Sequence, residues 1–185
     1  MSEILFNPQI KFLSPDKVLF ATGLAAGQTV VDLGAGSGFY AIAAAKIVGE
    51  TGNVFVADIL ESALEHVSAE ARLKFLRNIK TFRCDLEKPQ SCLNVTEGSV
   101  DLIIMANILH QIGNKNNLMS EAYRLLKSGG KLLLIDWNHK PSTIGPVVDS
   151  RIDEDATRQL ALKFNFKFNR GVDTDNYHYG LVFVK

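Results

Sequence analysis

The sequence lacks the features that mark membrane, disulfide-rich or nucleic-acid-binding proteins. It has 185 residues but only 2 cysteines, and the spacing of Cys84 and Cys92 matches no disulfide framework or metal site. No apolar run approaches the ~20 residues of a membrane-spanning helix. Lys plus Arg and Asp plus Glu number 20 each, so the zero net charge offers no excess of positive charge for phosphates. We therefore expect a soluble, cytoplasmic protein with no metal and no membrane or nucleic-acid partner.

The N-terminal residues also lack the pattern of a secretory signal. Glu3 stands near the start, and no basic stretch precedes a long apolar run. One segment is instead rich in bases: Arg72, Lys74, Arg77 and their neighbours up to residue 83 include no acid. An RNA-facing patch is one interpretation, but the absence of interleaved aromatic residues favours a solvated helix face followed by an edge strand.

Short β-rich runs alternate with helical patterns along the chain, which is typical of a parallel sheet with crossover helices. Apolar residues make up 46% of the sequence, enough for the core of one domain spanning residues 1–185. The expected strands cover residues 29–33, 53–58, 79–84, 100–105, 131–136, 164–168 and 177–184, and the expected helices cover 14–25, 39–48, 61–75, 117–127 and 153–163. The last two strands are joined by a short loop, so we expect them to pair antiparallel.

The strongest chemical signal is the run Asp-Leu-Gly-Ala-Gly-Ser-Gly, which lies between a buried strand and an Ala-rich helix. Gly34, Gly36 and Gly38 allow a tight turn that a ligand can approach, and the helix start supplies unpaired N–H groups. The third glycine comes one residue too early for a dinucleotide-binding fingerprint. Asp32 disfavours a pyrophosphate and suits a ligand with an ammonium group. The alternative is a tight turn without a ligand.

Two further acids follow strands in register with this turn. Asp58 ends the second strand, where a carboxylate accepts hydrogen bonds from both hydroxyls of a ribose. The alternative for Asp58 is a solvated cap of the next helix. Asp85 ends the third strand and suits an exocyclic adenine amine, while Leu86 packs on the ring. An Asx turn that opens the following loop is an equally favoured interpretation of Asp85.

These motifs resemble the class I S-adenosylmethionine-dependent methyltransferases, in particular the small ubiquinone/menaquinone-biosynthesis-type branch. The resemblance covers nearly the whole chain. The matching segments are Asn7-Pro8 with Ser14–Leu19, Val31–Phe39, Asp101–Asn107 with Leu109-His110, Leu125–Leu132 and His178–Phe183.

The resemblance implies a doubly wound, Rossmann-like α/β fold with strand order 3-2-1-4-5-7-6, strand 7 antiparallel and helices on both faces. It implies that the three glycines lie beside the methionine part of S-adenosyl-L-methionine, with Ile59 against the adenine and Asn107 below the methyl group. Residues 1–27 correspond to a leading helix and a reduced lid. Asn165 stands where many relatives have glycine, although asparagine tolerates the same left-handed conformation.

The predicted function is methyl transfer to a small-molecule acceptor, with S-adenosyl-L-homocysteine as the second product. In-line displacement needs mainly positioning, and a general base is required only if the nucleophile must lose a proton. His110 is the first candidate base, and Asp136 and His139 are weaker ones. The alternative for His110 is a partly exposed side chain that packs against a loop.

Other interpretations remain open or are disfavoured. A catalytically silent cofactor-binding or scaffold module and an aminopropyltransferase-like enzyme are the alternatives, although no acids for a polyamine follow the fourth strand. The segment Asn107–His110 differs from the motif of amino-methylating DNA enzymes. Cys84 and Cys92 do not match the cysteine set of arsenite methyltransferases, and Cys84 is interpreted as a small buried apolar residue. The short N-terminal segment makes a homodimer a further hypothesis.

Overall fold

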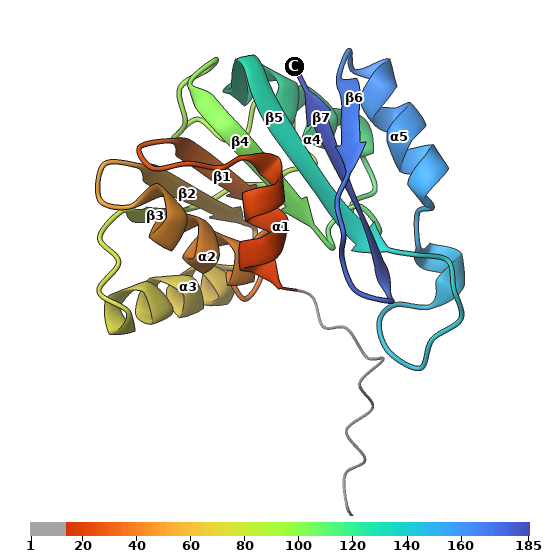
Figure 1. Cartoon of the computed structure of the whole chain (residues 1–185), viewed down its shortest axis with the longest axis horizontal. Coiled ribbons are helices and arrows are strands. Elements are labelled where there is room, and N and C mark those ends of the chain that lie inside the picture. The colour runs from red at the N-terminus through yellow and green to blue at the C-terminus, as the bar shows by residue number, and fades with distance from the viewer. Residues whose placement is uncertain (1–13) are drawn as a thin grey trace, which may run out of the picture.

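Seven strands form one twisted sheet in the part of the chain that the computed structural model describes, residues 14–185 (Figure 1). Its order is β3-β2-β1-β4-β5-β7-β6. The strands are β1 (Thr29–Leu33), β2 (Asn53–Asp58), β3 (Ile79–Arg83), β4 (Val100–Ala106), β5 (Leu126–Trp137), β6 (Lys167–Gly171) and β7 (His178–Val184).

The strand directions determine the edge of the sheet at which a ligand is expected to bind. Strands β1 to β5 run parallel, whereas β7 pairs antiparallel with both β5 and β6. The chain order reverses at β1, which lies between β2 and β4. In such sheets ligands bind outside the carboxyl ends of the strands at this reversal. The fold class predicted from the sequence is confirmed.

Helices cover both faces of the sheet. The helices α1 (Pro15–Thr22), α2 (Phe39–Val48) and α3 (Glu61–Leu73) pack on one face, and α4 (Lys115–Leu125) and α5 (Glu154–Lys163) pack on the other. A short 3₁₀ helix, η1, covers Val148–Ser150. The alanines of α2 are buried, which lets this helix lie close to the sheet at the start of the candidate site.

Several predicted boundaries differ from the structure, and three of them have a clear physical reason. Helix α1 ends at Thr22 rather than near Ala25, because Gly23 takes a left-handed conformation with φ of 77°. Strand β5 begins at Leu126, within the predicted helix, because Leu126 pairs with Val100 before the ladder shifts register. Strand β6 starts three residues late, after Asn165 adopts the predicted left-handed conformation with φ of 64°.

The interpretation of the cysteines as unpaired is wrong. Cys84 at the end of β3 and Cys92 in the following loop form a disulfide, with their Cα atoms 5.5 Å apart. The loop between them turns back on itself, so that residues eight positions apart meet. Sequence spacing alone does not reveal such a meeting.

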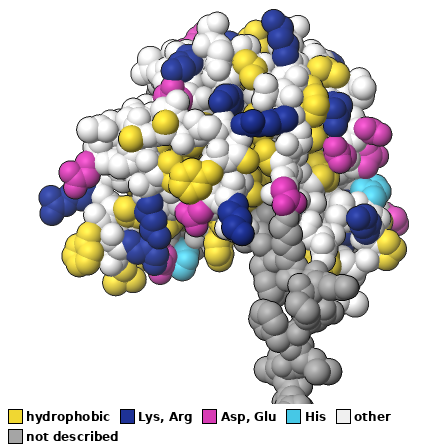
Figure 2. Space-filling model, viewed as in Figure 1, with side chains coloured by type: hydrophobic (Ala, Val, Ile, Leu, Met, Phe, Trp, Pro, Cys, Tyr) yellow, Lys and Arg dark blue, Asp and Glu magenta, His cyan; other side chains and the backbone are white. Residues whose placement is uncertain are grey.

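The surface carries mixed charge. Figure 2 shows Lys and Arg side chains spread over one face among acidic and apolar ones, rather than gathered in one patch. Within residues 14–185, no helix has the length and apolar character needed to cross a membrane. The same residues include no group of three or more His, Cys, Asp or Glu side chains arranged for a metal ion. Of the leading segment predicted at residues 1–27, residues 1–13 lie outside the described residues.

Candidate functional site

A cavity of about 550 Å³ opens at the carboxyl edge of the sheet, next to the ends of β1, β2 and β3. This volume lies in the range of small-molecule and cofactor sites. Six of the residues singled out from the sequence line it: Gly34, Gly36, Asp58, Ile59, Asp85 and Leu86. The structure therefore brings together residues from three separate strand ends.

The three glycines of the turn have two different roles. A Cβ on Gly34 would come within 2.6 Å of Ile108, and one on Gly38 within 2.5 Å of Val67 on α3. These two glycines permit close packing. Gly36 has a φ of 51° and nothing within 4 Å of its Cβ position, so it borders open space in the cavity wall.

Asp58 joins the glycine turn to the end of β2. The Gly36 N–H donates to its Oδ2 (2.9 Å), and the Leu60 N–H donates to its Oδ1 (3.0 Å). The side chain is largely buried yet borders the cavity. Each carboxylate oxygen has a second lone pair, so Asp58 retains the capacity to accept from a ligand.

Asp32 lies beneath the turn rather than on the cavity wall, and only 2% of it is exposed. Burial raises the pKa of its carboxyl to about 7, the Ala41 N–H partly opposes this shift, and the nearby Asp58 charge adds to it. No Lys or Arg side chain in the described part of the chain is bonded to Asp32. The ionised form is therefore costly in the empty protein and would be stabilised by a cation.

Asp85 and Leu86 form the far wall of the cavity. Asp85 makes the Asx turn that was one of its two interpretations, since its Oδ1 accepts from Glu87 N (3.2 Å). Its other oxygen lies 3.2 Å from Lys88 Nζ. Leu86 is buried in the core behind this wall. The turn does not exclude a contact with a ligand, because Asp85 also borders the cavity.

Asn107 follows β4 on the other side of the glycine turn. It adopts a left-handed conformation with φ of 57°, and its N–H donates to Ile135 O (2.8 Å). Its side-chain Oδ1 is buried without a hydrogen-bond partner. An unpaired buried acceptor is costly unless a donor arrives, so this atom suits a ligand N–H group.

His110 is held by a buried carboxylate. Its Nδ1 lies 2.9 Å from Asp136 Oδ1, and Asp136 also accepts from the backbone N–H of Leu109 (3.0 Å) and of Trp137 (2.8 Å). Asp136 is fully buried and 11% of the His110 side chain is exposed. A carboxylate only accepts, so Nδ1 donates and Nε2 of the neutral ring carries the free lone pair.

The other candidates after β5 are engaged in the loop. His139 Nε2 lies 2.9 Å from Arg151 O, and the Arg151 guanidinium donates to the carbonyls of Pro146 and Asn138. Trp137 stacks against His178 with ring centroids 4.2 Å apart. These contacts organise the loop and engage one ring nitrogen of His139, so His139 remains a weaker candidate than His110.

Sequence reasoning missed part of the cavity wall. The additional lining residues are Leu60, Cys84, Glu87, Lys88, Ile108, Gln111 and Ile112. Ile108 and Ile112 are spaced four residues apart after β4, which places both apolar side chains on one side of a turn. This spacing could have indicated Ile108 and Ile112 as lining residues, whereas no local sequence feature indicated Cys84.

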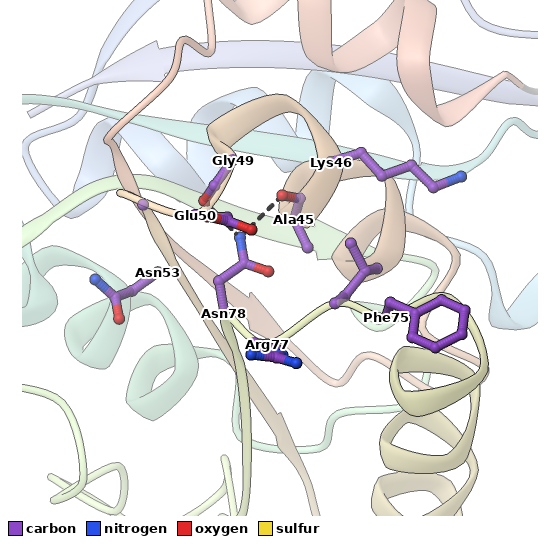
Figure 3. Close-up of a pocket in the computed structure, with 10 residues that line it drawn as sticks. Ala45, Lys46, Gly49, Glu50, Asn53, Phe75, Arg77 and Asn78 are labelled. Atoms are coloured by element: carbon purple, nitrogen blue, oxygen red, sulfur yellow. Dashed lines mark hydrogen bonds between the residues drawn. The ribbon is translucent and has the colours of Figure 1, made fainter.

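A second cavity, of about 390 Å³, lies at the opposite edge of the sheet, between the end of α2 and the start of β3. Figure 3 shows Asn78 reaching across it. The Asn78 amide donates to Ala45 O (2.9 Å) and Gly49 O (2.8 Å), which are carbonyls at the end of α2. The Asn78 amide therefore finds its partners within the chain, unlike the Asn107 side-chain oxygen at the carboxyl edge.

Comparisons with known proteins agree with this geometry. A family model described as "Methyltransferase domain" matches residues 24–171. The chain is 32% identical over 118 residues to proteins named ubiquinone/menaquinone biosynthesis C-methyltransferase UbiE from Citrobacter koseri and from Haemophilus ducreyi. The match covers 63% of this chain and 45% and 44% of these relatives, so the chain spans less than half of their length.

A solved structure extends the likeness to nearly the whole chain. A SAM-dependent methyltransferase from Aquifex aeolicus superposes with a TM-score of 0.85 at 27% sequence identity. The superposition covers 93% of this chain and 89% of the other.

Proposed function

This chain belongs to the methyltransferase-domain family and is an S-adenosylmethionine-dependent methyltransferase, and we propose that it methylates a small-molecule acceptor in the cleft at the carboxyl edge of its sheet. We propose further that residues 1–185 act as one domain, in which residues 1–27 supply a leading helix and a reduced lid. The observation that carries the proposal is the cavity at the strand reversal, which is lined by the glycine turn and by acids from two neighbouring strands.

The adenosine half of the cofactor would occupy the cavity of about 550 Å³. Asp58 would accept from the ribose hydroxyls while it keeps its bonds to Gly36 and Leu60. Adenine would lie between Ile59 and Leu86, with its amine at Asp85. The exposure of Ile59, at 49% in the empty protein, supports this role, because ring binding would bury it.

The methionine half would lie against Gly34, Gly36, Gly38 and the two polar side chains on either side of them. Asp32 would balance the ammonium charge, and the unpaired Asn107 Oδ1 would accept a hydrogen bond from the ammonium group. The raised pKa of Asp32 supports this assignment, because a buried carboxyl without a cation is complementary to an ammonium ligand.

The bound cofactor supplies an electrophilic methyl group on a sulfonium, and the chain's task is to position a nucleophile and exclude water. His110 would take a proton from a nucleophile that must lose one. Asp136 is a positioning residue, because it fixes the ring so that Nε2 is the basic atom.

The test is calorimetric titration with S-adenosyl-L-methionine and S-adenosyl-L-homocysteine. We expect micromolar binding by the wild type and a loss of about tenfold or more in Asp58→Ala, which removes the ribose acceptor. No binding by the wild type would contradict the proposal and favour a silent scaffold module.

Asp101→Asn is the matched control. Asp101 is also a strand aspartate that accepts a backbone N–H, from Thr29 (2.8 Å), but it lies at the amino edge of the sheet. This variant should keep wild-type affinity, so that a loss in both variants would indicate general destabilisation. Sedimentation with the cofactor present would test the proposed homodimer, and a monomer would remove it.

A further inference from the structure

The Cys84–Cys92 disulfide brackets one wall of the cofactor cavity. Four consecutive residues inside the bracket, 85–88, border the cavity, and Cys84 borders it as well. The bridge therefore closes a ring whose interior is the wall that faces adenine in the proposed function. Closing such a ring removes conformations from the loop that would otherwise compete with the binding geometry.

The loop between Cys84 and Cys92 is also held by hydrogen bonds to α4 and to the segment that precedes it. Glu87 accepts from the Gly113 N–H (2.7 Å) through its side chain and from the Asn117 side chain through its carbonyl. The Cys92 N–H donates to Glu121 Oε1 (2.9 Å), and Glu121 is paired with Arg124. Besides the chain itself, the bridge is thus the covalent tie between the loop and the residue that follows β3, and the contact of Cys84 Sγ with Ser91 Oγ (3.1 Å) adds to it.

We propose that Cys84 and Cys92 are a reversible thiol–disulfide modification site that controls how tightly the cavity binds the adenosine part of the cofactor. The inference rests on the proposed function, because it assigns that ligand to this cavity. The oxidised protein holds residues 85–88 in the binding geometry. The reduced protein lets the loop sample other geometries, and its cofactor affinity falls.

The exchange consumes two equivalents of a small thiol. The first thiolate attacks Cys84 Sγ, the bond between the two cysteine sulfurs breaks, and Cys92 Sγ takes the electron pair and then a proton. The second thiolate displaces Cys84 Sγ, which is protonated in turn and leaves a small-molecule disulfide and two protein thiols. Oxidation by a small disulfide such as oxidised glutathione is the same sequence in reverse.

Access to the bridge links it to the ligand. Cys92 is fully buried, whereas Cys84 is 3% exposed and borders the cavity. A bound ligand would cover Cys84 and slow its reduction. Because coupling between two sites is reciprocal, a ligand that prefers the oxidised protein must also stabilise the bridge against reduction.

The experiment is titration of the full chain with S-adenosyl-L-homocysteine, first oxidised and then reduced with dithiothreitol, with thiols counted by mass spectrometry after alkylation. We expect affinity to fall threefold or more on reduction and to return after oxidised glutathione is added. A smaller fall would overturn the inference while leaving the proposed function intact. Absence of binding in both states would contradict the proposed function itself.

A variant without the bridge separates its effect from that of the reagent. Cys84→Ser with Cys92→Ala should bind like the reduced wild type and ignore dithiothreitol. Serine suits position 84 because Cys84 Sγ lies 3.1 Å from Ser91 Oγ, which can pair with a hydroxyl. Ser91→Ala is the matched control: it removes this contact, keeps both cysteines, and should retain the response to reduction.

A measurement on the wild type alone covers the case in which the double variant does not fold. The rate of reduction by dithiothreitol is measured with and without saturating S-adenosyl-L-homocysteine, and circular dichroism monitors the fold. We expect the ligand to slow reduction threefold or more. Equal rates would overturn the inference.

Discussion

The amino and carboxyl edges of the sheet differ in whether the chain supplies hydrogen-bond partners for their polar side chains. At the amino edge, three polar side chains bond to partners within the chain. Asn78 caps α2, Asp101 accepts from Thr29 and pairs with Lys127, and Lys131 donates to Thr22 O. These bonds connect helix ends and strand starts. At the cavity of that edge, the Asn78 amide is bonded to two carbonyls of the chain.

At the carboxyl edge, buried groups are left incomplete. Asp32 carries a raised pKa without a cation, and Asn107 Oδ1, Tyr40 Oη and His178 Nε2 are buried without a hydrogen-bond partner. Such groups destabilise an empty protein. The comparison supports the proposal that the amino edge stabilises the fold, whereas the buried groups of the carboxyl edge are complementary to a ligand.

The largest expected effect at the carboxyl edge is on turnover. Once a screen of small molecules finds an acceptor, His110→Gln should lower kcat about 100-fold if that acceptor must lose a proton, because general base catalysis contributes at this scale. Steady-state rates of S-adenosyl-L-homocysteine formation measure this loss, and calorimetry should show unchanged cofactor affinity.

Asp136→Asn is the companion variant. It removes the carboxylate that orients His110, so a part of the same kcat loss should appear, and the double variant should be no slower than His110→Gln. Full activity in His110→Gln would mean that this histidine only packs the loop.

The second-largest effect is expected at Asp32, where ligand affinity and protein stability should change in opposite directions. Asp32→Asn should weaken S-adenosyl-L-homocysteine binding about 100-fold, because it removes the charge opposite the ammonium. The same change should raise the Tm of the empty protein at pH 8 by a few degrees, because it abolishes a buried carboxylate. Calorimetry and thermal unfolding measure the two quantities, and a fall in both would contradict this account.

The pH dependence has a defined sign. Burial raises the folded pKa of Asp32 from 3.8 to about 7, so the folded protein holds this proton more tightly than the unfolded chain. Its contribution to stability is present below pH 4 and is lost as pH rises to 7. Affinity for the ammonium ligand should show the opposite trend, falling about fivefold from pH 7 to pH 6. Asp32→Asn should abolish that slope.

The smallest effect is expected at the amino edge. Asn78→Ala removes two hydrogen bonds to the end of α2 and should lower the free energy of unfolding by about 1–2 kcal/mol. Urea unfolding measures this loss. Cofactor affinity should be unchanged, and a change of more than threefold would show that the two edges are coupled.

Local sequence was sufficient for the elements nearest the site. The bounds of β1, α2 and β2 agree with the pattern, because glycines and N-capping turns delimit short apolar runs there. The start of β5 was missed, because Leu126 joins the sheet through its contact with Val100, which is distant in the sequence. Propensity within a window contains no information on such a partner.

The residues of the site also divide into those that local sequence predicts and those that depend on contacts between distant segments. Residue type and spacing suffice to predict that the glycine turn, Asp58 and Asp85 lie together, because strand ends of a parallel sheet meet at one edge. The bond between His110 and Asp136, the cavity wall at Ile108 and Ile112, and the Cys84–Cys92 bridge each join residues through the folding of loops. Loop paths depend on packing against the rest of the molecule, so these contacts exist only once the whole chain has folded.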